Sequence, residues 1–270
     1  MHGICTSAFP NLSTQYATMR ILYCGQKPIG EFCFAELLAR RKEGMTVVGA
    51  VSNTSIDCWW RSAGVSDMAS ATGIPFLRND RKDEAALLDF IKGTRPQVLL
   101  SVQHPWILSE KVLATVQGMA LNLHLAPLPE YKGWYGCSHA ILDQCVEFGV
   151  SLHWMMPRVD SGDIAYEARF PIESRDTAQR LYARAVDAGE GLFRILLDDL
   201  AAGHAPPRRP LVGNGRFYRR TDLDRRRELT CCGDLEAVAR IARAFYFPPF
   251  EPAYIRTGLE KVYLVPAEAA

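Results

Sequence analysis

Three polar side chains in the middle of this 270-residue chain are of the types that move an acyl group between two nitrogens. They are Asn122, His124 two residues later, and Asp160 further along the chain. Acyl transfer to an amine passes through a tetrahedral carbon whose oxygen becomes negative, while the attacking nitrogen loses a proton. Asn122 can donate to that oxygen, and His124 can donate to it or shuttle a proton. Asp160 can fix the histidine tautomer and accept the proton of the amine, directly or through water.

Each of these residues also has an ordinary structural explanation. Asn122 and His124 can end a buried strand and hydrogen bond to backbone groups, while Asp160 and Gly162 are typical of a turn. Two residues apart on an extended segment, however, Asn122 and His124 point to the same face. Considered together, the three side chains therefore favour a catalytic site over three separate structural roles.

The elements that must position these residues alternate between strands and helices. Apolar runs predict strands over residues 19–25, 46–52, 97–102, 121–124, 150–156 and 164–171. Helical spacing predicts helices over residues 31–40, 65–72, 84–92, 136–145 and 176–202. Such alternation predicts an α/β fold with a largely parallel twisted sheet that is covered on both faces.

The order of these motifs resembles the formyltransferases that use N10-formyltetrahydrofolate. In that family an N-x-H-x-S-L-L-P-x-[YF]-[RK]-G segment precedes a D-[TSAG]-G motif, and the corresponding segments here are residues 122–133 and 160–162. The resemblance implies a Rossmann-like formyltransferase core and catalytic roles for Asn122, His124 and Asp160. One departure is Ala126, where most members have Ser, so a hydroxyl is missing from this loop.

A folate donor would bind at the carboxyl ends of the parallel strands, where such sheets collect ligands. The predicted donor-binding residues are Gln103, His104, Trp106, Ile107 and Asp163. A pterin needs an apolar slot with hydrogen-bonding groups, which Trp106, Ile107 and nearby backbone groups can provide. In the resembled family the corresponding loop helps to hold the folate. The alternative is that Trp106 is a core aromatic and His104 an ordinary loop residue.

A second set of residues is predicted to bind the acceptor. The residues are Gly25, Lys27, Lys132, Trp134, Tyr135, Tyr218 and Arg219. Residues 25–30 either form a plain tight turn or hold a phosphate or carboxylate at the start of a helix. Residues 216–222 and 241–255 resemble the tail of formyltransferases that act on nucleotide-linked amino sugars. Guanidinium groups suit a pyrophosphate and aromatic rings suit a base, so the resemblance implies a dTDP-, UDP- or GDP-amino sugar.

The chain is predicted to have three parts. Residues 1–18 form an N-terminal extension, residues 19–203 the formyltransferase catalytic domain, and residues 204–270 a small C-terminal α+β subdomain that binds substrate. A formal net charge of +1 is too balanced to favour a nucleic acid as the main partner. No segment approaches the ~18 apolar residues of a membrane span, so a cytoplasmic protein without a membrane partner is expected. Exposed apolar segments in the tail favour a homodimer.

The eight cysteines contain no C-x-x-C pair. The best metal candidate is the group of Cys137, His139 and Cys145, but its spacing fits no common zinc site, so no metal is expected.

These features predict an N-formyltransferase that passes the formyl group of N10-formyltetrahydrofolate to the primary amine of a nucleotide-activated amino sugar, as in surface polysaccharide precursors. Hydroxyornithine, a carrier-bound amino acid and methionyl-tRNA stay open as other amines, although the near-neutral charge and short tail weigh against tRNA. A non-catalytic nucleotide-sugar or folate-binding protein is the alternative from another class. A dinucleotide-dependent oxidoreductase is disfavoured because the G-x-G-x-x-G fingerprint is absent.

Overall fold

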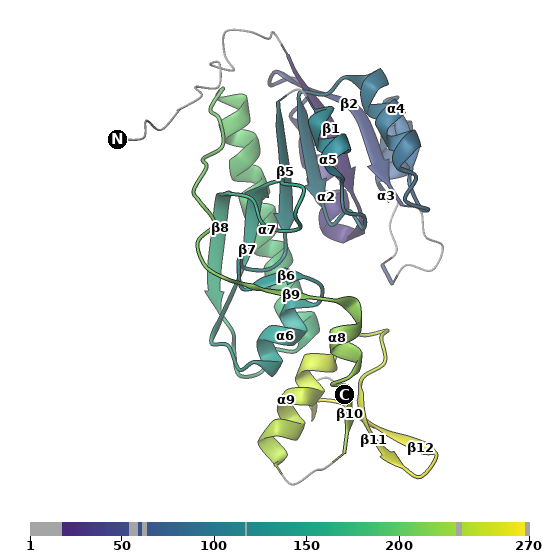
Figure 1. Cartoon of the computed structure of the whole chain (residues 1–270), viewed down its shortest axis with the longest axis vertical. Coiled ribbons are helices and arrows are strands. Elements are labelled where there is room, and N and C mark those ends of the chain that lie inside the picture. The colour runs from purple at the N-terminus through teal and green to yellow at the C-terminus, as the bar shows by residue number, and fades with distance from the viewer. Residues whose placement is uncertain (1–17, 54–58, 61–63, 117, 231–233, 268–270) are drawn as a thin grey trace.

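The computed structural model describes residues 18–53, 59–60, 64–116, 118–230 and 234–267 (Figure 1). The expected N-terminal extension therefore lies outside the described residues, apart from Thr18. The first strand begins at Met19, as the sequence predicts. No helix in the described ranges is both long enough and apolar enough to cross a membrane.

A seven-stranded sheet forms the centre of the structure, in the order β3-β2-β1-β4-β5-β7-β8. The strands are β1 Met19–Gly25, β2 Met45–Ser52, β3 Phe76–Arg78, β4 Val98–Val102, β5 Met119–His124, β7 Glu147–Trp154 and β8 Ile164–Pro171. The first five strands in this order, from β3 through β2, β1 and β4 to β5, pair in parallel. Strand β7 pairs antiparallel with β5, and β8 pairs antiparallel with β7 at the edge of the sheet. This arrangement confirms the expected α/β fold with a largely parallel sheet.

Helices cover both faces of this sheet. They are α2 Lys27–Ala39, α3 Gly64–Thr72, α4 Glu84–Thr94, α5 Glu110–Ala114 and α7 Ala178–Ala201. Helices α2, α3 and α7 contribute to one buried apolar cluster, and α4 and α5 contribute to a second one. Strands buried on two faces read as continuous apolar runs, which is why β1 and β4 could be predicted. The apolar stripe of α7, which includes Leu181, Phe193 and Leu196, is buried as expected.

The connection between β1 and α2 is shorter than predicted. Helix α2 begins at Lys27, so the expected loop over residues 25–30 reduces to Gln26 between the two elements. Pro28 fits the first turn because its missing N–H has no acceptor within the helix there. A Cβ at Gly30 would lie 3.2 Å from the carbonyl carbon of Gly25 and 3.4 Å from the carbonyl oxygen of Val102. Glycine therefore lets the helix start pack directly against the ends of β1 and β4.

The tail forms a small α+β unit, coloured from green to yellow in Figure 1, and most of it lies below the main sheet in that view. Its elements are β9 Arg216–Tyr218, α8 Arg220–Asp224, β10 Glu228–Leu229, α9 Leu235–Phe245, β11 Ala253–Thr257 and β12 Glu260–Leu264. Strands β10, β11 and β12 form a three-stranded sheet, and α9 packs beside α6 (Gly136–Leu142). Strand β9 instead pairs with the short strand β6 (Tyr131–Gly133). The tail is therefore connected directly to the segment that follows β5.

Candidate active site

Asn122 and His124 lie on one face at the carboxyl end of β5. Alternation along the strand buries Met119, Leu121 and Leu123 and leaves Asn122 and His124 half-buried on the opposite face. The parallel neighbour β4 ends beside them, with Ser101 opposite Asn122 in the ladder. This position is the edge of a parallel sheet where ligands collect.

Asp160 reaches the same place from the turn between β7 and β8. Its φ is 47°, in the left-handed region that aspartate tolerates better than most side chains. Its Oδ2 lies 3.9 Å from His124 Nδ1 and accepts a hydrogen bond from the Gly133 N–H at 2.9 Å. The structure thus brings together the three residues that the sequence singled out for catalysis.

The backbone of β6 sets the orientation of the His124 ring. His124 Nε2 donates to the carbonyl oxygen of Tyr131 at 2.7 Å. Nδ1 is then the nitrogen that faces Asp160, so it is the one available for proton exchange. The sequence assigned control of the tautomer to Asp160 alone and missed the part played by Tyr131.

Asp160 is an ionised carboxylate in this arrangement. Burial by itself raises the pKa of Asp160, but His124 and the Gly133 N–H hold that pKa well below its usual range. The carboxylate therefore stabilises a proton on a neighbouring histidine or on an attacking amine, rather than resting as an acid.

A fourth residue of this cluster is His153 on β7, which was not among the predicted site residues. Its side chain is 3% exposed, and its Nε2 lies 3.1 Å from Asn122 Nδ2 and 3.5 Å from Asp160 Oδ1. Strand pairing places it there, because β5 and β7 align Asn122 with His153. A single sequence does not reveal that register, so no signal in it pointed to His153.

The tail supports the site through the pairing of β6 with β9. Strand β6 supplies both the Tyr131 carbonyl and the Gly133 N–H that contact the catalytic residues. Gly133 has a φ of 88°, and a Cβ there would collide with the carbonyl oxygen of Tyr218. On the next residue, the Trp134 N–H donates to that same oxygen at 3.0 Å. Only glycine allows the tail strand to approach this closely.

The loop between β5 and β6 contains Ala126, where the family pattern has Ser. A residue of β7 hydrogen bonds to the backbone of this loop. Ala126 is buried, and its side chain packs close to Gly136 at the start of α6. The Leu128 N–H donates to the Ser151 hydroxyl at 3.0 Å. A serine on β7 therefore anchors the loop backbone.

The residues predicted to bind a folate donor follow β4, beside the catalytic cluster. Both ring nitrogens of His104 are buried without a hydrogen-bond partner in the described part of the chain, and burial lowers its pKa to about 4. Trp106 Nε1 donates to the Asn79 carbonyl at 2.7 Å, while Ile107 is 56% exposed. The remaining candidate, Asp163, lies in the β7–β8 turn with its carboxylate 3.5 Å from Arg208.

Lys27 at the start of α2 is affected by the charge of Arg220, a residue from a distant part of the chain. Lys27 donates to Gln103 Oε1 at 3.0 Å, and burial together with the charge of Arg220 lowers its pKa to about 8. The Arg220 guanidinium lies over the Trp134 ring, 4.7 Å from its centroid. The backbone N–H of Arg219, which the sequence predicted to bind the acceptor, donates to Asp222 at the start of α8. Arg220, which follows it, was not predicted and is the residue whose charge acts on Lys27.

Other predicted acceptor residues occupy different surroundings. Tyr218 is only 4% exposed, stacks on Tyr131 and His139, and donates to Asp143 at 3.0 Å. The structure therefore places Tyr218 in the packing between tail and core rather than on a surface open to an acceptor. Tyr135 is 43% exposed, Lys132 is half-buried on β6, and Gly25 ends β1 as a buried residue.

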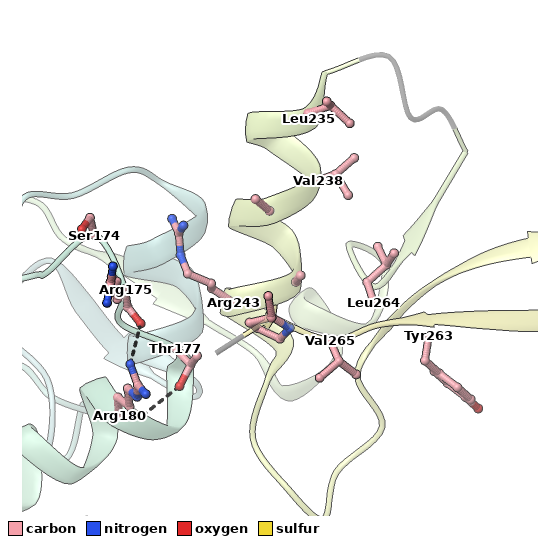
Figure 2. Close-up of a pocket in the computed structure, with 14 residues that line it drawn as sticks. Ser174, Arg175, Thr177, Arg180, Leu235, Val238, Arg243, Tyr263, Leu264 and Val265 are labelled. Carbon is pink, nitrogen blue, oxygen red and sulfur yellow. Dashed lines mark hydrogen bonds between the residues drawn. The ribbon is translucent and has the colours of Figure 1, made fainter. Parts of the chain in front are cut away.

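A cavity of about 430 Å³ is lined by other residues, and Figure 2 shows the side chains around it. The start of α7, one face of α9 and the end of β12 enclose it, and Arg180, Val238 and Val265 are among its lining residues. None of the residues predicted to act in catalysis or binding lines this cavity. The candidate active site is therefore the cluster at the end of β5.

Four of the eight cysteines lie within the described residues. Within the described ranges, no group of three or more His, Cys, Asp or Glu side chains could hold a metal ion. Cys24, Cys33 and Cys137 are buried free thiols, and Cys145 hydrogen bonds to the Tyr131 hydroxyl. The other four cysteines, Cys5, Cys58, Cys231 and Cys232, lie outside the described residues.

Gly162 is a position in the catalytic turn that cannot accept a side chain without a shift of the backbone. A Cβ there would overlap the carbonyl oxygen of Trp154. We expect Gly162→Ala to lower the free energy of unfolding by on the order of 3 kcal/mol, measured by urea denaturation. Gly191→Ala on α7, where an added Cβ meets nothing within 4 Å, is the control and should be neutral or stabilising. Equal stability of the Gly162→Ala and wild-type proteins would contradict the tight turn.

Known proteins are similar to this chain in sequence and in fold. A family model described as "Formyl transferase" matches residues 34–196, more than half of the chain. The methionyl-tRNA formyltransferase of Moorella thermoacetica is 33% identical over 143 residues, which are 53% of this chain and 46% of that protein. The chain thus spans about half the length of that relative. The GDP-perosamine N-formyltransferase of Brucella melitensis is 26% identical over 254 residues, 92% of each chain.

Solved structures of similar fold extend over nearly the whole chain. A 4-N formyltransferase from Francisella tularensis has a TM-score of 0.75 at 17% identity, covering 92% of this chain and 97% of that one. An N-formyltransferase from Helicobacter canadensis, solved with folinic acid and dTDP-3-aminofucose, has a TM-score of 0.70 at 20% identity, covering 91% and 86%. The likeness includes the tail as well as the seven-stranded sheet.

Proposed function

This chain belongs to the formyl transferase family, and we propose that it transfers the formyl group of N10-formyltetrahydrofolate to the primary amine of a nucleotide-activated amino sugar. The observation that carries the proposal is the convergence of Asn122, His124 and Asp160 at the carboxyl end of β5. The match to the Brucella melitensis sugar enzyme over 92% of both chains supports the choice of acceptor.

Asn122, His124 and Asp160 have different roles in the proposed reaction. The amine attacks the formyl carbon, a C–N bond forms, and the carbonyl electron pair moves to the formyl oxygen. Asn122 donates a hydrogen bond to that oxygen as it becomes negative. His124, through Nδ1, and Asp160 take the proton that the amine loses and deliver it to N10 as the bond from carbon to N10 breaks. The number of protons and electron pairs is unchanged, so no oxidant or reductant is required.

The surroundings of the segment after β4 support a folate donor. A pterin carries several hydrogen-bonding atoms on a flat ring, and His104 has two buried ring nitrogens without partners among the described residues. Because burial lowers the pKa of His104, its ring is neutral at pH 7 and can both donate and accept. The exposed Ile107 side chain adds apolar surface beside it.

The basic pair at the start of α2 supports an anionic acceptor. The Arg220 charge lowers the pKa of Lys27, so the two positive groups repel each other, and the Trp134 ring lies against the Arg220 guanidinium. Two cations close together repel unless an anion lies between them, and a pyrophosphate supplies that charge. We therefore assign Lys27 and Arg220 to the diphosphate of the acceptor.

Lys27→Met is expected to raise the KM for the sugar nucleotide about 10-fold or more at pH 7, because a charge-assisted hydrogen bond to phosphate is lost. With a pKa of about 8, the Lys27 ammonium is lost as the pH rises through 8, so the wild-type KM should also rise there. The variant has no ammonium to lose and should lack that additional rise. Initial rates at pH 6.5 to 9 measure both effects.

Lys92→Met is the matched control, since Lys92 is exposed on α4 and pairs with Asp89. Its KM should equal that of wild type at each pH. An unchanged KM in Lys27→Met would remove Lys27 from the acceptor site.

The proposal is tested with the purified full-length protein, N10-formyltetrahydrofolate and a panel of dTDP-, UDP- and GDP-linked amino sugars. Release of tetrahydrofolate is followed by absorbance, and gain of a formyl group on the sugar by mass spectrometry. Methionyl-tRNA is included because the Moorella thermoacetica relative carries that name, and hydroxyornithine is included as another amine. Formylation of at least one sugar nucleotide, well above the other amines, is expected. Formylation of none of the sugars would overturn the proposal.

A further inference from the structure

His153 makes two hydrogen-bonding contacts that fix its own proton. Nδ1 donates to the carbonyl oxygen of Trp154 at 3.0 Å, so in the neutral ring Nε2 carries a lone pair. The side chain is 3% exposed and lies on β7 directly opposite Asn122. The lone pair therefore points into the catalytic cluster and not toward solvent.

That lone pair decides which end of the Asn122 amide faces His153. The nitrogen Nδ2 lies 3.1 Å from Nε2 and donates one of its two hydrogens to it. The reversed amide would bring its oxygen against the Nε2 lone pair, and the two acceptors would repel. The second N–H of Nδ2 is thereby kept for a substrate oxygen.

Asp160 competes for the same histidine nitrogen. Its Oδ1 lies 3.5 Å from His153 Nε2, while its Oδ2 faces His124 Nδ1 and the Gly133 N–H. Asn122 Nδ2 is the nearer of the two groups, at 3.1 Å, and a ring that already donates through Nδ1 can accept its N–H.

We propose that neutral His153 is a positioning residue for formyl transfer, which accepts a hydrogen bond from Asn122 Nδ2 and so holds the amide in the orientation that donates to the developing oxyanion. The proposal rests on the proposed function and adds a fourth side chain to the catalytic three.

The matched variants are His153→Leu, which fills the space without an acceptor, and His153→Gln, whose Oε1 can replace Nε2. We expect kcat of His153→Leu to fall about 100-fold, the lower end of the loss on removing an oxyanion donor, with both KM values within about 3-fold of wild type. His153→Gln should recover kcat to within about 10-fold of wild type. Equal losses in the two variants, or wild-type kcat in His153→Leu, would overturn the proposal.

A double-mutant cycle with Asn122→Ala separates positioning from general damage. If His153 acts through Asn122, the double variant Asn122→Ala/His153→Leu should be no slower than Asn122→Ala. Losses that multiply would show that His153 supports the site in some other way. If His153→Leu does not fold, kcat of His153→Gln decides instead: a value within about 10-fold of wild type supports the proposal, and a fall of about 100-fold would contradict it.

The hydrogen bond can also be measured without turnover. In the substrate-free protein, NMR of the Asn122 side-chain amide should show one proton shifted downfield, and His153→Leu or, if that does not fold, His153→Gln should change this shift. An inactive wild-type enzyme with the shifted proton would refute the proposed function while leaving the contact intact. Absence of the shifted proton in an active enzyme would refute the role of His153 alone.

Discussion

Replacement of Asp160 by Asn is expected to lower kcat for formyl transfer by about 1000-fold, within the range for loss of an acid–base group. Asp160 lies 3.9 Å from His124 and 3.5 Å from His153, and His124 and the Gly133 N–H hold its pKa well below the usual range. Asn has the same shape but no charge, so it neither stabilises a protonated histidine nor accepts the proton of the amine. The two KM values should change much less than kcat.

The matched control for this variant is Asp89→Asn, an exposed position on α4 where the same chemical change should leave kcat unaltered. Thermal unfolding would show that Asp160→Asn remains folded. Retention of kcat within 10-fold of wild type would exclude Asp160 from proton transfer and would require another group to accept the proton.

Replacement of His124 is expected to have a comparable effect. His124→Gln keeps a side-chain N–H that can donate to the Tyr131 carbonyl but has no nitrogen that exchanges a proton. We expect kcat to fall by about 100- to 10,000-fold in this variant, as for other general acid–base groups. His124→Ala should be at least as slow, because it also leaves the Tyr131 carbonyl without its partner.

Single-turnover rates with saturating substrates measure the His124 effect without the contribution of product release. His204→Ala is the control, since His204 is exposed near the end of α7 and contacts only Asp199 among the salt-bridge partners of the described residues. A His124→Gln enzyme as fast as wild type would assign the His124 ring to orientation rather than to proton transfer.

The large elements of the fold could be predicted because burial leaves a pattern in the sequence. Strands β1 and β4 are continuous apolar runs, and α7 carries an apolar stripe at helical spacing. The short strands β6 and β9 have three residues each and no usable periodicity, so their pairing could not be foreseen. Neither could the start of α2 at Lys27, where the proline is compatible with both a loop and a first helical turn.

The candidate active site could likewise be predicted only in part from sequence patterns. Asn122 and His124 share a strand, so their common orientation follows from the twofold alternation of extended chain. The position of Asp160 beside them was implied by family resemblance and not by any local pattern. His153 depends on the register between β5 and β7, and Arg220 depends on where α8 begins, and both are properties of tertiary structure. Residues that act through neighbours on other elements were therefore the ones that the sequence missed.

The pairing of β6 with β9 has a consequence for protein engineering. A chimera that joins residues 19–203 to the tail of a relative would keep all of the catalytic side chains but exchange the strand that lies against the Tyr131 carbonyl and the Gly133 N–H. Such an exchange would therefore change the surroundings of His124 and Asp160 even though neither residue is replaced. A junction placed after Tyr218 would keep the pairing of β6 with β9 and exchange only the elements that follow it.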